Sequence, residues 1–167
     1  MQDLLHRVLE FTGEGVYRYR FDDGAVLLAN RALVRILDLD LDPRELAGRR
    51  IYDLMGPESA ALHGELASIG EIRGRQYAFT TCKGARRWVL HDAFVVEEAA
   101  THTRLVEGIL RDITAAKRAE DALSRQSGLL QALMDAMPDL IFFKDEKSRF
   151  IAGNKALARL MLGHEDV

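Results

Sequence analysis

The order of hydrophobic and polar residues predicts a short helix and then a β-hairpin at the start of the chain. Residues 2–12 carry apolar side chains at helical spacing, and Gly13 and Gly15 stop that pattern. Next, GVYRYRF and AVLLAN flank an Asp22-Asp23-Gly24 turn. GVYRYRF alternates apolar and polar residues, and an aspartate-glycine turn between two predicted strands is typical of a β-hairpin.

Several short helices are predicted to follow. Asn30 stands where a helix cap belongs, before RALVRILDL. Pro43, the segment IYDLM and Pro57 each begin another helical piece, and Gly70 ends the last one.

From Ile72 the pattern changes to a period of two. RQYAFTTC and RRWVLHDAFVVE, separated by Lys83-Gly84, predict a long hairpin, and RLVEGILRDI predicts a third strand. A hairpin, short helices and three long antiparallel strands predict an α+β fold, with the short helices on one face of a single sheet.

A long helix is predicted from Thr114, its expected cap, to Pro138. Along it, seven positions alternate in spacings of three and four, with Gln126 as the one polar member. They are Ala116, Ala119, Leu123, Gln126, Leu130, Leu133 and Met137. An apolar stripe on a helix is stable only when another surface covers it. We therefore expect the stripe to form a coiled-coil seam with a second copy in a homodimer. The alternative is a helix that folds back on its own domain.

After Pro138 the pattern repeats. DLIFFKDEKSRFIAGNKALARLMLGHEDV matches VYRYRFDDGAVLLANRALVRILDLDLD, and Asn154 takes the place of Asn30. The second copy lacks three strands, so we expect it to be poorly ordered or to take packing from a neighbour. The expected organisation is a capping helix (1–12), a first domain (13–113), a linker helix (114–137) and a truncated second domain (138–167).

Composition and charge fit a globular regulatory domain. The 167 residues are 48% hydrophobic, which allows a core, and a net charge of −3 lacks the basic surplus that nucleic-acid binding needs. A single cysteine, Cys82, forms no internal disulfide and fits a cytoplasmic protein. No apolar run reaches the length of a membrane span, and the first residues are too polar for a secretory signal.

The motifs that would indicate an enzyme are missing from the sequence. The five histidines have no metal-ligand spacing, and there is neither a phosphate-cradling glycine loop nor a G-x-S-x-G motif. We therefore expect a protein that is not an enzyme and holds no catalytic metal, with any catalytic output outside this chain.

Three segments resemble the PAS/PAC family of sensory domains: DITAAKRAEDAL at the start of the long helix, KGARRW, and LANRALVRILDL. The resemblance covers residues 13–123 and begins again over 138–167. One departure is Asp38, where many members have glycine. The resemblance implies a five-stranded antiparallel sheet whose short helices enclose a cavity. It also implies dimerisation and an output domain of the histidine kinase or GGDEF/EAL type, as in sensor histidine kinases of two-component systems and diguanylate cyclases.

The resemblance also suggests which residues line the pocket, by register with flavin-binding relatives. The inward positions are Tyr77, Phe79, Thr81, Val89, His91, Ala93, Val106, Gly108 and Leu110. A small-molecule ligand is one interpretation and a filled core without a ligand is the other. For His91, pairing with a backbone carbonyl is favoured over contact with a ligand.

Strand parity places a second apolar set on the outer sheet face. Its members are Trp88, Leu90, Phe94, Val96, Leu105 and Ile109. An apolar face of this kind needs a cover. The N-terminal helix, through Leu4, Leu5, Val8 and Leu9, is the expected one, and a second subunit is the candidate to complete it.

For cofactors the leading expectation is none. His63 lies in the helix where haem-binding PAS domains carry their ligand, which makes haem an alternative. A flavin photoadduct is excluded because GRRIYDLMGPE has no cysteine, whereas flavin without an adduct is unsupported.

Asp112 and Thr114 are expected to transmit a signal from the last strand into the long helix, and simple capping is the alternative. The expected function is a sensory module of a signalling protein that responds to a small ligand or a partner. A ligand-free dimerisation module is the main alternative, and a haem- or flavin-based redox or gas sensor is a further one.

Overall fold

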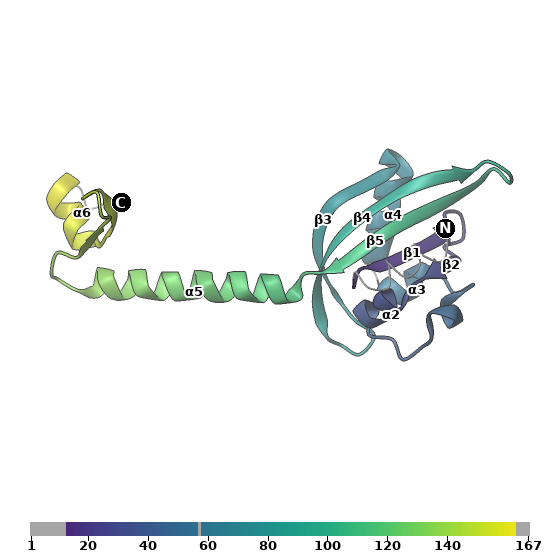
Figure 1. Cartoon of the computed structure of the whole chain (residues 1–167), viewed down its shortest axis with the longest axis horizontal. Helices are drawn as coiled ribbons and strands as arrows, with labels where there is room; N and C mark the ends of the chain where they lie inside the picture. Colours follow the sequence, from purple (N-terminus) through teal and green to yellow (C-terminus); the bar gives the residue numbers. More distant parts are fainter. Residues whose placement is uncertain (1–12, 57, 163–167) are drawn as a thin grey trace. The chain divides into compact units, whose positions relative to one another are not determined.

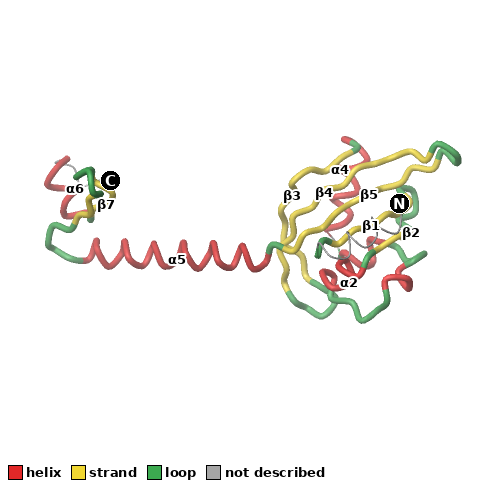
Figure 2. The backbone as a smooth tube through the Cα atoms, in the orientation of Figure 1, coloured by secondary structure: helices red, strands yellow, loops and turns green. Residues whose placement is uncertain are grey.

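The structure is a computed structural model that describes residues 13–56 and 58–162 (Figures 1 and 2). The chain divides into two units, one ending at Ala115 and the other beginning at Ala116. The predicted helix over residues 1–12, with its proposed cover of the outer sheet face, lies outside the described residues.

The first unit is built on a five-stranded antiparallel sheet in the order β2-β1-β5-β4-β3. The strands are β1 (Gly15–Arg20), β2 (Val26–Ala29), β3 (Glu71–Thr80), β4 (Arg86–Glu98) and β5 (Thr103–Asp112). The first hairpin therefore pairs with the last strand, so residues far apart in the chain become neighbours. The predicted fold class is confirmed.

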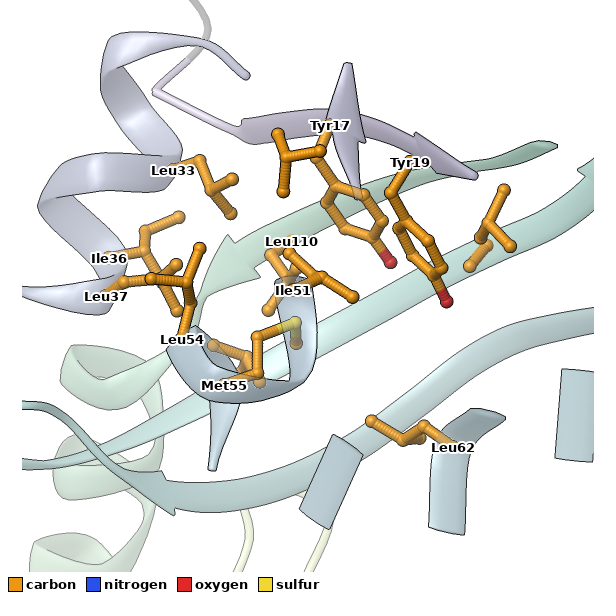
Figure 3. Close-up of a cluster of buried hydrophobic side chains, with 14 of the residues drawn as sticks. Tyr17, Tyr19, Leu33, Ile36, Leu37, Ile51, Leu54, Met55, Leu62 and Leu110 are labelled. Atoms are coloured by element: carbon orange, nitrogen blue, oxygen red, sulfur yellow. The ribbon is translucent and has the colours of Figure 1, made fainter. Parts of the chain in front are cut away.

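Between β2 and β3, residues 30–56 and 58–70 contain four helices. They are α2 (Arg31–Leu37), the 3-10 helix η1 (Pro43–Leu46), α3 (Ile51–Met55) and α4 (Glu58–Ile69). Their apolar side chains pack with inward strand residues in one core, as Figure 3 shows for Leu33, Ile51 and Leu110. These three side chains are at most 1% exposed.

Both ends of α2 follow from its sequence. The Asn30 side chain accepts a hydrogen bond from the Leu33 amide at 2.9 Å, which satisfies a donor of the first turn. The helix ends at Asp38, whose φ of 62° is the left-handed conformation that glycine adopts most easily. The departure from the family's glycine therefore affects only a local turn.

Strand parity agrees with the prediction along β4. Val89, His91 and Ala93 are buried, whereas Phe94 on the opposite face is 46% exposed. Leu105 was expected on the outer face with Phe94, but it is only 4% exposed.

The close approach of Tyr17 to β5 requires a glycine. Tyr17 pairs with Gly108, and Gly108 pairs with Ala93 on the next strand. A Cβ atom added at Gly108 would lie 2.3 Å from Cζ of Tyr17, far inside van der Waals contact. Gly108 and Ala93 are small, so they leave room for the Tyr17 ring to lie across the inner face of the sheet.

The second unit contains most of α5 (Thr114–Ala136), followed by β6 (Phe142–Lys144), β7 (Phe150–Gly153) and α6 (Lys155–Leu162). The second copy thus has a hairpin and a following helix that correspond to β1, β2 and α2 of the first copy. Its aromatic residues are exposed, with Phe142 at 48% and Phe150 at 52%. Packing of these residues against a neighbour stays a prediction.

The predicted seam of α5 is exposed along the helix. Leu123, Leu130 and Leu133 are 66%, 56% and 53% exposed, and Met137 follows one residue after the helix end. Ala119 is also exposed. Pairing of this stripe with a second copy stays a prediction.

Replacing Gly108 tests the packing of Tyr17. Gly108→Ala should lower the free energy of unfolding by about 1–3 kcal/mol, because the new methyl group displaces the Tyr17 ring. Urea unfolding measures the change. The control is Gly64→Ala in α4, where an added Cβ meets no atom within 4 Å and a helical alanine should stabilise by about 1 kcal/mol. Equal effects of the two variants would contradict the packing argument.

Candidate functional site

The inner face of the sheet carries a cluster of two phenols and an imidazole, in which Tyr17 and His91 are buried and Tyr77 is partly buried. The Tyr17 hydroxyl lies 2.5 Å from Nε2 of His91, and the Tyr77 hydroxyl lies 3.3 Å from Nδ1 of the same ring. His91 is 2% exposed. The prediction that His91 pairs with a backbone carbonyl is therefore wrong. Both of its ring nitrogens contact phenols, one from β1 and one from β3.

His91 and Tyr17 are both uncharged near pH 7. Burial lowers the pKa of His91 to about 4, and burial raises the pKa of Tyr17 well above its ordinary value. A neutral imidazole donates from one ring nitrogen and accepts at the other. One phenol therefore donates a hydrogen bond to His91 and the other accepts one from it, so the cluster suits uncharged hydrogen-bonding groups.

A second aromatic cluster joins the first through Tyr19. The rings of Tyr17 and Tyr19 stack at 5.8 Å between centroids, and Tyr19 meets Tyr52 of α3 edge-on at 6.1 Å. The Tyr52 hydroxyl lies 2.7 Å from Nδ1 of His63. The ring of His63 also packs on Phe21, with centroids 4.4 Å apart. An aromatic row thus runs from β3 to α4.

The haem-ligand role considered for His63 stays a prediction. Its Nδ1 is hydrogen-bonded to Tyr52, so Nε2 is the ring nitrogen that would hold a haem iron. Burial lowers the pKa of His63, with a smaller contribution from Arg104. Cys82 is exposed and lies in the turn between β3 and β4. Within residues 13–56 and 58–162, no group of three or more metal-ligating side chains comes together.

The other predicted pocket residues lie mostly in the core. Phe79, Val89, Val106 and Leu110 are at most 3% exposed. Thr81 is different, because it lies just after β3, where its hydroxyl accepts the Ala85 amide at 3.0 Å. It closes the β3–β4 hairpin, and its hydroxyl also donates to Asp38 at 3.3 Å. Thr81 is therefore a turn residue and not part of the polar cluster.

An open hollow of about 280 Å³ lies where β3 and β4 change register. Its lining residues are Glu71, Ile72, Arg73, Asp92, Ala93 and Phe94. The amide of Gly74 donates to Asp92 there at 2.7 Å. The residues of the phenol–imidazole cluster do not line this hollow, so the two features are separate.

Sequence reasoning missed Tyr17, Tyr19 and Tyr52. The alternation in VYRYRF places both tyrosines of β1 on one face, which is a signal that the sequence contains. Tyr52 gives no such signal, because its contact with His63 depends on how α3 packs beside α4.

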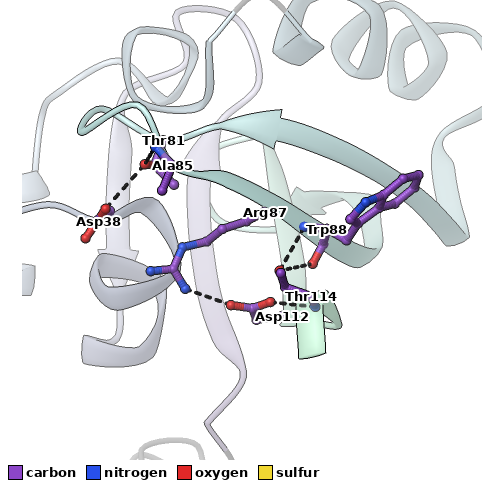
Figure 4. Close-up of polar contacts among 7 residues, drawn as sticks. All are labelled: Asp38, Thr81, Ala85, Arg87, Trp88, Asp112 and Thr114. Atoms are coloured by element: carbon purple, nitrogen blue, oxygen red, sulfur yellow. Dashed lines mark hydrogen bonds and ion pairs between the residues drawn. The ribbon is translucent and has the colours of Figure 1, made fainter. Parts of the chain in front are cut away.

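The start of α5 is tied to β4 at Trp88 (Figure 4). The hydroxyl of Thr114 accepts the Trp88 amide at 2.9 Å and lies 3.4 Å from the Trp88 carbonyl. The amide of Ile113 also donates to that carbonyl at 2.9 Å. The strand that carries His91 therefore holds the first residues of the helix.

Asp112 performs the capping that was predicted for Thr114. Its Oδ1 accepts the Thr114 amide at 2.9 Å, and its Oδ2 pairs with Arg87 at 2.8 Å. Burial raises the pKa of Asp112, but the hydrogen bonds from Thr114 and Arg87 outweigh burial and leave the pKa below its ordinary value. The predicted cap by the Thr114 hydroxyl is wrong, because that hydroxyl is engaged with Trp88.

Comparison with protein families identifies both units. A family model described as PAS domain matches residues 14–115, and a second model with the same description matches residues 128–165. The chain belongs to the PAS domain family. A search of curated proteins found no match.

Solved structures share the fold at low sequence identity. A PAS domain from a two-component sensor histidine kinase is 15% identical, with 66% of this chain and 95% of that chain covered and a TM-score of 0.52. A sensory box histidine kinase/response regulator from Burkholderia thailandensis is 21% identical, with 77% and 98% covered and a TM-score of 0.55. An RNA-binding light-oxygen-voltage receptor is 16% identical, with 77% and 37% covered and a TM-score of 0.58.

The acid stability of the protein tests the buried state of His91. Its pKa is about 4 when folded and near 6.5 when unfolded, so the unfolded chain binds more protons between these values. Stability should fall as the pH drops from about 6.5 to about 4, by roughly 3 kcal/mol in all. His91→Gln keeps a donor and an acceptor but does not titrate. Urea unfolding at several pH values should give a flatter curve for the variant, and parallel curves would contradict the assignment.

Proposed function

We propose that this chain is the sensory module of a multidomain signalling protein, and that it transmits the state of its inner sheet face through α5. Membership of the PAS family supports a sensory role, since PAS domains are typically sensory. The observation that carries the proposal is the hydrogen bonding of Thr114 to Trp88.

The coupling follows from the spacing along β4. Trp88 lies three residues before His91, which contacts both phenols of the buried cluster. A ligand or partner that displaces a phenol from His91 shifts β4 locally. Trp88 and the hydrogen-bonded start of α5 then move with the strand. Asp112 keeps the helix capped during this motion, because Arg87 of the same strand holds its carboxylate.

The ligand site in this proposal is the phenol–imidazole cluster with the apolar side chains around it. Tyr77, Phe79, Val89, His91, Val106 and Leu110 keep their predicted roles there, and Tyr17 joins them. The neutral state of His91 and Tyr17 favours an uncharged ligand that both donates and accepts hydrogen bonds. A haem or flavin cofactor is a further candidate.

The output domain of the signalling protein lies outside this chain in the proposal. A histidine kinase domain or a GGDEF/EAL domain is the expected output, and the apolar stripe of α5 pairs two copies as a homodimer. The proposed location is the cytoplasm. No helix in the described ranges combines the length and the apolar character of a membrane span.

A ligand-free dimerisation module is the second candidate. Leu33, Leu37 and Leu46 are fully buried, so helix side chains fill much of the space beside the sheet. The exposed apolar stripe of α5 supports pairing of two copies under both candidate functions, so it does not distinguish them.

Native mass spectrometry with an absorbance spectrum separates the two candidates. We expect a dimer whose mass exceeds two chains by a bound small molecule. A Soret or flavin band would identify the molecule as haem or flavin. A dimer of bare protein mass would favour the ligand-free module, whereas a monomer at micromolar concentration would contradict the pairing of α5 in both.

Removing the junction contacts should uncouple sensing from output. Thr114→Val deletes the hydroxyl that binds Trp88, and Asp112→Asn weakens the ion pair with Arg87. Each variant should cost about 1 kcal/mol of stability, since one exposed or half-buried contact is lost. The stimulus-dependent change in output of the full-length protein should disappear.

The matched control is Thr80→Val, at the exposed end of β3. It makes the same chemical change away from the junction and should leave the response intact. An unchanged response in the Thr114 and Asp112 variants, with the fold preserved by circular dichroism, would refute the proposed route.

A further inference from the structure

The second unit is organised around a buried amide and not around a hydrophobic core. Asn154 is 1% exposed, and it is the only buried residue in the described part of that unit, residues 116–161. Large apolar side chains nearby, such as Phe143 and Ile151, are more than half exposed. Hydrogen bonds to one asparagine therefore hold the hairpin and the helices together here.

Asn154 contacts three parts of this unit at once. Its Nδ2 donates to the carbonyl of Asp139 at 2.7 Å and to the carbonyl of Met134 at 3.0 Å, with Met137 at 3.4 Å. Its Oδ1 accepts the amides of Ile141 at 3.2 Å and Leu157 at 3.1 Å. The last carbonyls of a helix lack partners within the helix, so this side chain caps the end of α5 and the start of α6 together.

The capping is reciprocal. Asp135, in the last turn of α5, accepts the amide of Lys155, the first residue of α6, at 2.9 Å. The side-chain amide nitrogen of Gln131 in α5 donates a hydrogen bond to the Asp135 carboxylate at 3.1 Å. It also donates to the carbonyl of Gly153 at 3.4 Å. The end of α5 and the start of α6 thus exchange side-chain caps, and the carboxylate of Asp135 suits the positive end of the α6 dipole.

The first repeat uses the same amide geometry. Asn30 donates to the carbonyl of Glu14 at 2.7 Å and accepts the amides of Val16 and Leu33, both at 2.9 Å. Asp139, Ile141 and Leu157 are the matching partners of Asn154. In the second repeat the amide also binds carbonyls of α5, which is the helix that leaves the first unit.

We propose that this cap exchange, formed by Asn154 and Asp135, is the site at which α5 passes its position to the second PAS repeat. The inference rests on the proposed function, because it assigns the receiver of the helix motion. Asn154 and Asp135 are positioning residues. A rotation or shift of α5 moves the carbonyls of Met134 and Met137, and Asn154 carries that motion to the start of β6 through the Ile141 amide.

Replacing the side-chain nitrogen of Asn154 by oxygen, in Asn154→Asp, separates its donor contacts from its acceptor contacts. Asn154→Asp keeps an acceptor for Ile141 and Leu157 but loses the donor to the α5 carbonyls. Hydrogen–deuterium exchange of the full chain should become about tenfold faster at the end of α5 and in β6 and β7. Exchange in residues 13–112 should not change. Unchanged exchange at the end of α5 would overturn the inference.

The matched control is Asn30→Asp, which makes the same change in the first repeat. It should accelerate exchange near Glu14 and leave β6 and β7 as they are. Asp135→Asn, which keeps an acceptor oxygen for Lys155, should have a smaller effect than Asp135→Ala. Equal effects of the two Asp135 variants would count against the reciprocal cap.

The relay itself is tested by combining Thr114→Val with Asn154→Asp. Thr114→Val should change exchange in β6 and β7 when Asn154 is present and should have no such effect in the Asn154→Asp background. An equal effect in both backgrounds would overturn the inference and leave the proposed function standing. If Thr114→Val has no effect in either background, the proposed function fails, and the Asn154→Asp result alone then decides whether the cap exchange holds the second repeat.

Discussion

A buried side-chain amide fixes the start of β1, and the rest of the first unit depends on it. Asn30 is 2% exposed, and its oxygen accepts the amides of Val16 and Leu33 while its nitrogen donates to Glu14. Leaving such a buried group without partners would cost about 1–3 kcal/mol. Because these bonds join the first residues of β1 to the first turn of α2, they set the depth at which Tyr17 enters the core.

The position of β1 in turn determines the chemistry of the inner face. β1 lies between β2 and β5, so Tyr17 crosses Gly108 and reaches His91 on β4. Burial keeps this cluster uncharged, which allows it to lie beside fully buried leucines without a counter-ion. Directional hydrogen bonds in an apolar surrounding give the core a defined polar centre. Such a centre can recognise an uncharged ligand or fix the register of the strands around it.

The two ends of α5 are held by polar contacts, whereas its middle presents an apolar stripe. At the start, Asp112 caps the helix and the Thr114 hydroxyl binds Trp88. At the end, Asn154 and Asp135 exchange caps with α6. Hydrogen bonds are directional, so they hold a helix end in one rotational position. Apolar contacts along a stripe tolerate sliding more easily, and this division suits a helix that transmits motion between two repeats.

Local sequence patterns were sufficient for the elements of the described residues, their order and the repeat, and for the face on which most strand residues lie, with Leu105 as an exception. Periodicity, turn residues and cap residues are properties of neighbours in the chain, and they placed Val89, His91 and Ala93 inside and Phe94 outside. Only the tertiary structure decided the partners. His91 meets a tyrosine 74 residues away on β1, Thr81 turns to Ala85 and Asp38, and Thr114 binds Trp88 instead of capping its own helix. Those contacts depend on the register between strands that are distant in sequence. A slip of one residue would exchange the two faces, so no local pattern could specify them.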